Sequence, residues 1–279
     1  MSSRYKKASS RIARRGKIRR IFSISLKIGL PVVFLVGLIF LLRANFLQIK
    51  NFEVLGAETI QPTEIKNVAA NFISGNKFFL IPKSNILFLN EGSLSATLLS
   101  KFGRLEKVEI SKNFFNKQVG LKVTERKAEF LWCSSLDTCF FMTKDGLVFE
   151  NAGFTGSDFL TSSVNRIEPI NKIIFKGLLA GNPLMKNFAT PVKIENYLKF
   201  VQVFKDAGFE IFSIDIQSTD KAVAKSNIGD IIFNPEEPDL STVAQNTILL
   251  IKETQSKNPT ARFNYIDARF GNKFFYKLI

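Results

Sequence analysis

The first strongly patterned segment of the chain is a run of apolar residues without charge. It covers residues 28–42, and it covers 21–42 if one basic residue, Lys27, is accepted inside it. A helix needs roughly 20 apolar residues to cross a bilayer core, and a lysine near the edge can extend its ammonium to the headgroups. The run predicts a transmembrane helix over 28–43, with a start near residue 21 as the longer alternative. A cleaved signal peptide and a buried soluble helix are the alternatives, but no A-x-A cleavage site follows Leu42.

Between residues 46 and 126 the hydrophobic period switches repeatedly between two and about 3.6. The alternating segments predict strands, and the helical spacing that starts at Pro62 predicts a helix. The expected strands are 49–55, 105–110 and 119–124, with a short one near 78–81, and the expected helices start at Pro62 and cover 87–102. The order β-α-β-α-β-β predicts a small α+β domain with its helices on one face of the sheet.

Residues 127–279 are richer in strand patterns and predict a mixed, β-rich second domain. Asp145-Gly146 between two apolar runs is a strong hairpin pattern, and residues 151–169 are rich in glycine and serine, which is typical of a loop. The expected helices cover 190–207 and 239–254, and two strands, 263–270 and 273–278, meet at a Gly271-Asn272 turn.

Charge changes the picture of the N-terminus. The chain has a net charge of +15, but residues 1–27 hold ten basic residues and no acidic one, so the part after residue 43 is nearly balanced. Basic residues before a span place that end in the cytoplasm. We therefore expect a basic cytoplasmic tail over 1–27 that contacts membrane lipids, a single-pass location in the cytoplasmic (inner) membrane, and domains 46–126 and 127–279 outside the cytoplasm. Nucleic-acid binding by the tail is the alternative.

Composition limits the chemistry that the chain can perform. It has no histidine, which excludes Ser-His-Asp triads, Cys-His dyads and histidine-ligated zinc. Ser74 and Lys77 have the Ser-x-x-Lys spacing, but they lie in an expected turn without companion motifs. Glu236-Glu237 stands between two prolines, as in a solvated loop. We expect no enzyme, no catalytic residue, no cofactor and no metal site.

Two cysteines, Cys133 and Cys139, flank a short segment between strand patterns. If this part of the chain lies outside the cytoplasm, a disulfide between them can persist. A structural disulfide is favoured over two free thiols, and metal binding would need further ligands that the sequence lacks nearby.

The ordered set of segments resembles the FtsQ/DivIB family of bacterial cell-division proteins. The likeness lies in "FEVLGAETIQPTEI", "SGNKFFLI" and "LEKVEISKNFFNKQVGLKVTERKAEF" in the first domain, then "FMTKDGLVFENA", "DIIF" and "YIDARFGNKFFY" in the second. It implies a POTRA-like domain over 46–126, followed by a β domain over 127–279.

The resemblance also implies a function and a site. The protein would be a divisome scaffold without enzymatic activity that binds FtsB/DivIC-like and FtsL-like bitopic partners, helps control septal peptidoglycan synthesis and binds no nucleic acid. Its partners would add a strand to the C-terminal sheet edge. The implied contact residues are Tyr265, Asp267, Arg269, Phe270, Asn272, Phe274 and Tyr276. A POTRA-containing secretion or envelope-assembly component and a membrane-anchored cell-wall hydrolase are the alternatives.

Overall fold

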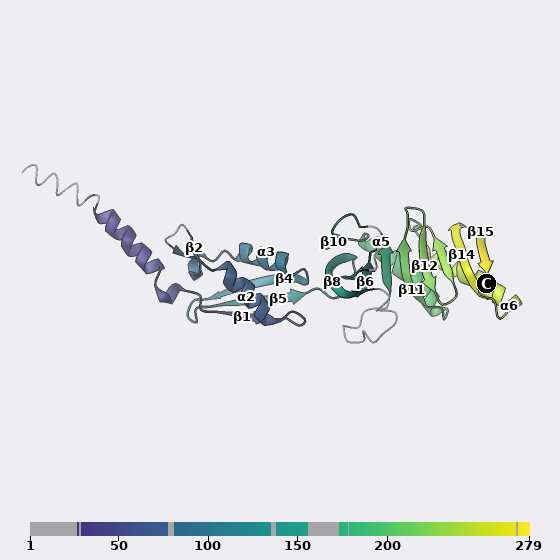
Figure 1. Cartoon of the computed structure of the whole chain (residues 1–279), viewed down its shortest axis with the longest axis horizontal. Coiled ribbons are helices and arrows are strands. Elements are labelled where there is room, and N and C mark those ends of the chain that lie inside the picture. Colours follow the sequence, from purple (N-terminus) through teal and green to yellow (C-terminus); the bar gives the residue numbers. More distant parts are fainter. Residues whose placement is uncertain are drawn as a thin grey trace, which may run out of the picture. The chain divides into compact units, whose positions relative to one another are not determined.

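The chain folds into two compact units in a computed structural model, which describes residues 27, 29–77, 81–134, 138–155, 173–177, 179–271 and 273–279 (Figure 1). Unit 1 comprises Met1–Lys101 and Lys107–Thr124. Unit 2 comprises Phe102–Glu106 and Glu125–Ile279. The predicted domain boundary lies between residues 126 and 127.

The predicted transmembrane helix over 28–43 is a misprediction. Among the residues that the structure describes, no helix is long and apolar enough to cross a membrane. The helical run over residues 29–42 corresponds to about 21 Å at the rise of an α-helix, against a hydrocarbon core of about 30 Å. The fold class that begins with a transmembrane helix and the single-pass inner-membrane location are corrected accordingly. Of the basic tail predicted over 1–27, residues 1–26 lie outside the described residues.

Unit 1 has two helices and a three-stranded sheet in the order β1-β5-β4. The strands are β1 (Asn51–Leu55), β4 (Leu105–Asn113) and β5 (Gln118–Glu125), the helices are α2 (Pro62–Phe72) and α3 (Glu91–Lys101), and β2 (Asn76–Lys77) pairs separately with β3 (Ile81–Pro82). β1 and β5 are parallel. Each helix buries a single row of side chains, such as Ile65 and Ala69 of α2, as its helical spacing predicts.

The second helix begins later than predicted. The sequence pattern starts it at residue 87, but Ile86–Phe88 forms a separate 3-10 turn, η2, and α3 starts at Glu91. The side chain of Asn90 accepts a hydrogen bond from the Ser93 N–H at 3.0 Å. This capping bond satisfies a free donor of the first helical turn and fixes where the helix begins.

Unit 2 is built on a ten-stranded sheet, counted over the described residues, in the order β10-β8-β7-β6-β9-β11-β12-β13-β14-β15. The strands are β6 (Phe130–Cys133), β7 (Thr138–Met142), β8 (Leu147–Thr155), β9 (Ile174–Gly177), β10 (Lys186–Asn187), β11 (Ile211–Ile216), β12 (Ala222–Ser226), β13 (Asp230–Phe233), β14 (Phe263–Phe270) and β15 (Lys273–Leu278). β8 continues to Thr155, where the composition predicts a loop from residue 151; residues 156–169 of that expected loop lie outside the described part.

Two helices connect parallel strands of this sheet. α5 (Pro191–Asp206) lies in the chain between β9 and β11, and α6 (Leu240–Lys257) lies between β13 and β14. Each crossover lets a helix cover the sheet it connects. The main core contains buried side chains from both helices and the strands, among them Phe200, Phe204, Ile251, Phe233 and Phe263. The core therefore extends to β14, next to the outermost strand.

Candidate functional site: a sheet edge

The two ends of the large sheet differ in length. One end is β10, a two-residue strand, and the other is β15, a six-residue strand. Figure 1 shows β15 outermost, with β14 on its inner side. A short edge strand offers few free main-chain groups, whereas a long one is a template for another strand. Of the two end strands described in this sheet, β15 is the longer and therefore the better template for a partner strand.

The main-chain groups that point away from β14 can be assigned by alternation. The N–H of Ile279, directly after β15, donates to the Arg262 carbonyl at 3.0 Å, toward the sheet. Alternate residues of an antiparallel edge strand direct N–H and C=O inward and outward. Phe274, Tyr276 and Leu278 therefore present their N–H and C=O groups to the open edge.

The side chains of β15 fall on two faces. Phe274 is half-buried and packs against the main core of unit 2. Tyr276, on the same face, is 45% exposed and its ring meets Phe263 at 5.6 Å in an edge arrangement. Phe275 lies on the opposite face, is 57% exposed and contacts Phe270 at 5.4 Å. The predicted contacts do not include Phe275, although it lies between two of them, Phe274 and Tyr276, on the same strand.

Asp267 and Arg269 form a bidentate pair on β14. Arg269 Nε and Nη2 donate to the Asp267 carboxylate at 2.9 and 2.8 Å, and the guanidinium lies 5.3 Å from the Phe270 ring. Partial burial raises the pKa of Asp267, but the hydrogen bonds from Arg269 outweigh it and hold that pKa below its usual value. The same bond raises the pKa of Arg269. The ion pair therefore fixes the side chains of both predicted contact residues on β14, the strand next to β15.

The remaining predicted contacts are not all on the edge strand. Tyr265 is half-buried on β14, opposite Lys277, and Phe270 ends β14 with 52% exposure. Asn272 lies outside the described residues. Of the predicted residues that the structure describes, Phe274 and Tyr276 belong to β15 itself, and Tyr265, Asp267, Arg269 and Phe270 lie on the neighbouring strand β14.

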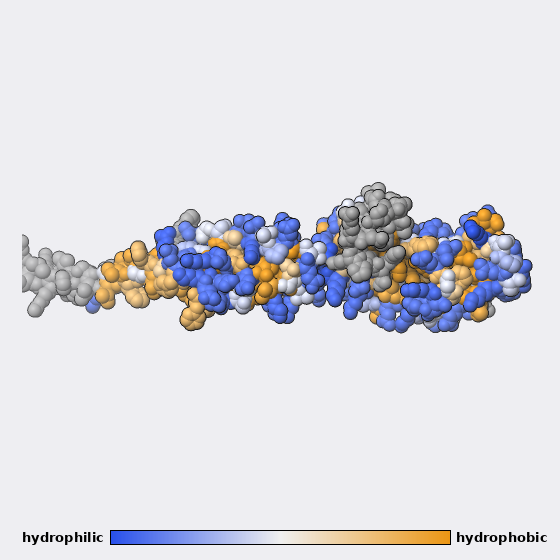
Figure 2. All heavy atoms as spheres, turned by 90° about the horizontal axis from the view of Figure 1, so that it is seen from below, coloured by the Kyte–Doolittle hydropathy of each residue, from blue (hydrophilic) through white to orange (hydrophobic). Residues whose placement is uncertain are grey.

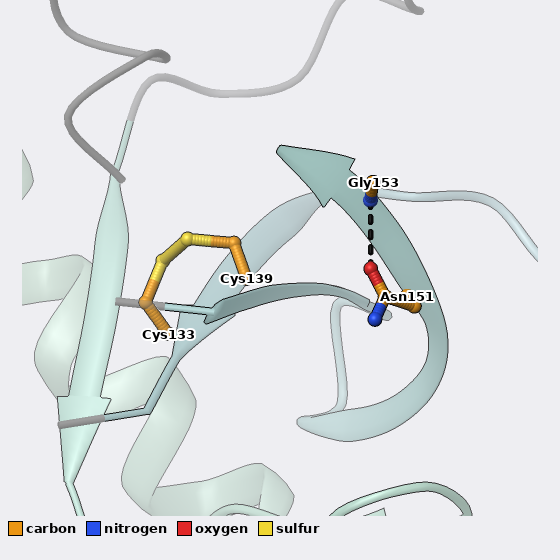
Figure 3. The surroundings of a disulfide bond; sticks show 4 residues. All are labelled: Cys133, Cys139, Asn151 and Gly153. Atoms are coloured by element: carbon orange, nitrogen blue, oxygen red, sulfur yellow. Dashed lines mark hydrogen bonds between the residues drawn. A yellow bond between two sulfur atoms is a disulfide. The ribbon is translucent and has the colours of Figure 1, made fainter. Parts of the chain in front are cut away.

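The two cysteines form a disulfide in the structure. Cys133 and Cys139 are directly opposite each other on β6 and β7, with their Cα atoms 4.1 Å apart. Both side chains are fully buried. Figure 3 shows the bond near β8, where the Asn151 side chain accepts a hydrogen bond from the Gly153 N–H at 2.7 Å. The disulfide closes a small loop at the end of the hairpin.

The other sequence candidates show no catalytic arrangement. Ser74 Oγ donates to the Asn71 carbonyl at 2.7 Å, just after α2, so its proton is directed at the main chain. Glu236 pairs with Lys193. In the part of the chain that the structure describes, no group of three histidine, cysteine or acidic side chains could hold a metal ion.

One pocket of about 550 Å³ lies at the start of α5. Lys193 and Glu236, which line it, neutralise each other. Tyr197, also in the lining, is buried, and this burial raises its pKa to about 12. The Tyr197 phenol is therefore neutral at ordinary pH. Lys193, Glu236 and Tyr197 together give the pocket hydrogen-bonding groups and no net charge.

Comparison with known proteins leaves the family unassigned. No family model matches the chain, and no curated protein is similar enough to count as a match. The likeness to FtsQ/DivIB therefore rests on the ordered segments quoted above and not on an established relative.

Proposed function

We propose that this protein is a non-enzymatic scaffold that binds a partner protein by strand addition to β15. The observation that carries the proposal is the unequal pair of sheet ends: two residues in β10 against six in β15. Three residues of β15 present main-chain groups outward, and exposed aromatic side chains flank them on both faces. Main-chain hydrogen bonds would supply affinity, and the alternating side chains would select the partner.

The resemblance to FtsQ/DivIB extends the proposal to bacterial cell division. The partners would be FtsB/DivIC-like and FtsL-like proteins, and the scaffold would help control septal peptidoglycan synthesis. The mixture of two helices with a three-stranded sheet in unit 1, followed by a strand-rich unit 2 with a long C-terminal edge, supports this reading. Binding sites held on one platform raise the effective concentration of weak partners, which is how a scaffold acts without chemistry.

The edge can be tested through its main chain. Proline at position 276 removes an outward N–H and leaves the inward hydrogen bonds of its neighbours in place, as edge strands tolerate. Tyr276→Ala and Tyr276→Pro both remove the aromatic contact, but only the proline variant also loses at least one main-chain hydrogen bond to the partner. We therefore expect Tyr276→Pro to lower partner affinity about tenfold more than Tyr276→Ala does.

The partner can be tested by co-purification of the full chain with the FtsB-like and FtsL-like proteins of the same organism. Recovery of either with wild-type protein, and its loss with Tyr276→Pro at unchanged thermal stability, supports the proposal. Equal recovery with both forms would show that β15 is not the docking edge. Recovery of neither partner would remove the cell-division part of the proposal.

A further inference from the structure

The hairpin between β4 and β5 carries two exposed phenylalanines at its tip. Phe115 is 98% exposed and Phe114 is 50% exposed. The turn is ordered by a hydrogen bond from the Asn116 N–H to the Asn113 side chain at 3.1 Å, and Lys117 adopts a left-handed backbone with φ of 54°. Neither ring is needed for the core of unit 1. Exposed large apolar groups gathered at one place mark a contact surface.

More apolar side chains lie at the same end of unit 1. The Lys50 N–H donates to the Lys117 carbonyl at 2.8 Å, which joins the hairpin tip to the segment after the 3-10 turn η1 (Asn45–Leu47). The Ile49 N–H donates to the Ser84 carbonyl, also at 2.8 Å, which joins that segment to η2. The two turns expose Phe46, Leu87 and Phe88, at 53%, 51% and 46%. We call these three residues with Phe114 and Phe115 the aromatic end.

Cations without acidic partners surround the aromatic end. Arg43, Lys50 and Lys83 are exposed, and Lys117 ends the hairpin turn. Within the described residues none of the four forms an ion pair, while the next lysine along β4, Lys112, is already paired with Glu91 at 3.0 Å. The aromatic end therefore combines exposed rings with uncompensated positive charge.

The aromatic end is also continuous with the apolar helix over residues 29–42. Asn85 Nδ2 donates to the Leu42 carbonyl at 2.7 Å, so η2 is bonded to the end of this helix. The last turns of the helix expose Phe40 and Leu41, at 79% and 53%. Figure 2 shows the helix as an almost unbroken hydrophobic surface on the side in view.

We propose that the aromatic end docks unit 1 onto a surface of anionic lipid. Convex phenylalanine tips can enter the boundary between headgroups and acyl chains without needing a pocket, and the flanking cations attract anionic phosphates. A protein partner would have to supply a hollow for Phe115. The docking is a surface contact of the hairpin and turns, and it requires no segment that crosses the bilayer.

The contact is tested with a fluorescent reporter at the tip. Phe115→Trp is combined with Trp132→Phe, which removes the chain's single natural tryptophan; the Trp132 indole Nε1 has no hydrogen-bond partner in the described structure, so its removal leaves no group unpaired. The matched control places the reporter in unit 2 by Leu249→Trp, at a helix position that is 65% exposed. Both full-length variants are mixed with brominated phosphatidylcholine vesicles, with and without phosphatidylglycerol.

We expect blue-shifted and quenched emission from the tip reporter with phosphatidylglycerol vesicles, and neither change from the control reporter. Phe114→Ser with Phe115→Ser should lower partitioning to these vesicles about tenfold. Lys50→Glu with Lys83→Glu should weaken binding to the anionic vesicles only. Three results would overturn the proposal: an unquenched tip on vesicles that sediment the protein, equal quenching without phosphatidylglycerol, or a shift that appears only when a protein partner is added.

Discussion

Reduction of the disulfide between Cys133 and Cys139 is expected to lower the free energy of unfolding of unit 2 by about 2–3 kcal/mol. The two cysteines are six positions apart, so the bond closes a small loop. For such a loop the chain-entropy relation gives about 8 cal/mol/K, or roughly 2.4 kcal/mol at 25 °C. Reduction changes no side-chain carbon, and it therefore avoids the cavity that a substitution would leave.

The single tryptophan provides the assay. Trp132 directly precedes Cys133 on β6 and is 2% exposed, so its fluorescence changes when this part of unit 2 unfolds. Urea titrations of the oxidised and reduced protein should differ in midpoint by about 1 M, given a slope of about 2–3 kcal/mol/M for a protein of this size. The oxidised form should have the higher midpoint.

The double variant Cys133→Ala with Cys139→Ala is the control, because its midpoint should not respond to reductant. Equal midpoints for the oxidised and reduced wild-type protein would refute the entropic reasoning, provided that thiol titration confirms the two redox states. A midpoint that falls by the same amount in the double variant would show that the reductant acts elsewhere.

Five more substitutions test unit 2 and its edge strand. Glu150→Ala should cost about 2–3 kcal/mol, because Arg104 is 3% exposed and loses a carboxylate at 2.6 Å; Glu150→Gln should cost less in the same urea assay. Phe275→Asp should abolish partner binding at unchanged stability, whereas Phe274→Asp should also lower the melting temperature, because Phe274 packs on the core. Hydrogen bonds from Ser241 and Thr242 lower the pKa of Asp239, the cap of α6, to about 2. The stabilisation that the ionised Asp239 carboxylate gives to α6 is present above about pH 4 and is lost as the pH falls toward 2. Asp239→Asn should therefore reduce the loss of unfolding free energy over this acid range.

Local patterns were enough to predict elements whose ends are set by their own residues. The final two strands, predicted at 263–270 and 273–278, are found there, because a turn at Gly271, which takes a φ of 68°, separates the two strand-like segments. The helix predicted over 190–207 is α5, capped by the Thr190 side chain, which accepts from the Lys193 N–H. Both rest on short-range rules of alternation and capping.

Long-range pairing and burial were not accessible from the same patterns. The parallel contact of β9 with both β6 and β11 joins segments far apart in the chain, and no local period encodes which strands pair. Arg104 looks like any surface arginine in the sequence, yet it lies 5.1 Å from the centre of the Phe141 ring and pairs with Glu150. The membrane helix over 28–43 was predicted wrongly: among the residues that the structure describes, no helix is long and apolar enough to cross a bilayer.

At the candidate site, the sequence located the edge strand but not the orientation of each residue on it. The resemblance pointed to Phe274 as a contact, whereas its ring is half-buried against the core. The resemblance does not include Phe275, although its ring is the more exposed of the two. Which face of a strand meets the core depends on the neighbouring strand and on the irregular register between Asp267 and Phe270, and a shift of one residue reverses the two faces.

The unequal ends of the large sheet also limit the stoichiometry of any complex. Because β10 has two residues and β15 has six, β15 is the longer of the two end strands described in this sheet, and we expect one partner strand to add there per chain. Two copies of the protein that met edge to edge through β15 would use the same main-chain groups. Self-association and partner binding would therefore compete, and a rising protein concentration would weaken the apparent affinity for the partner.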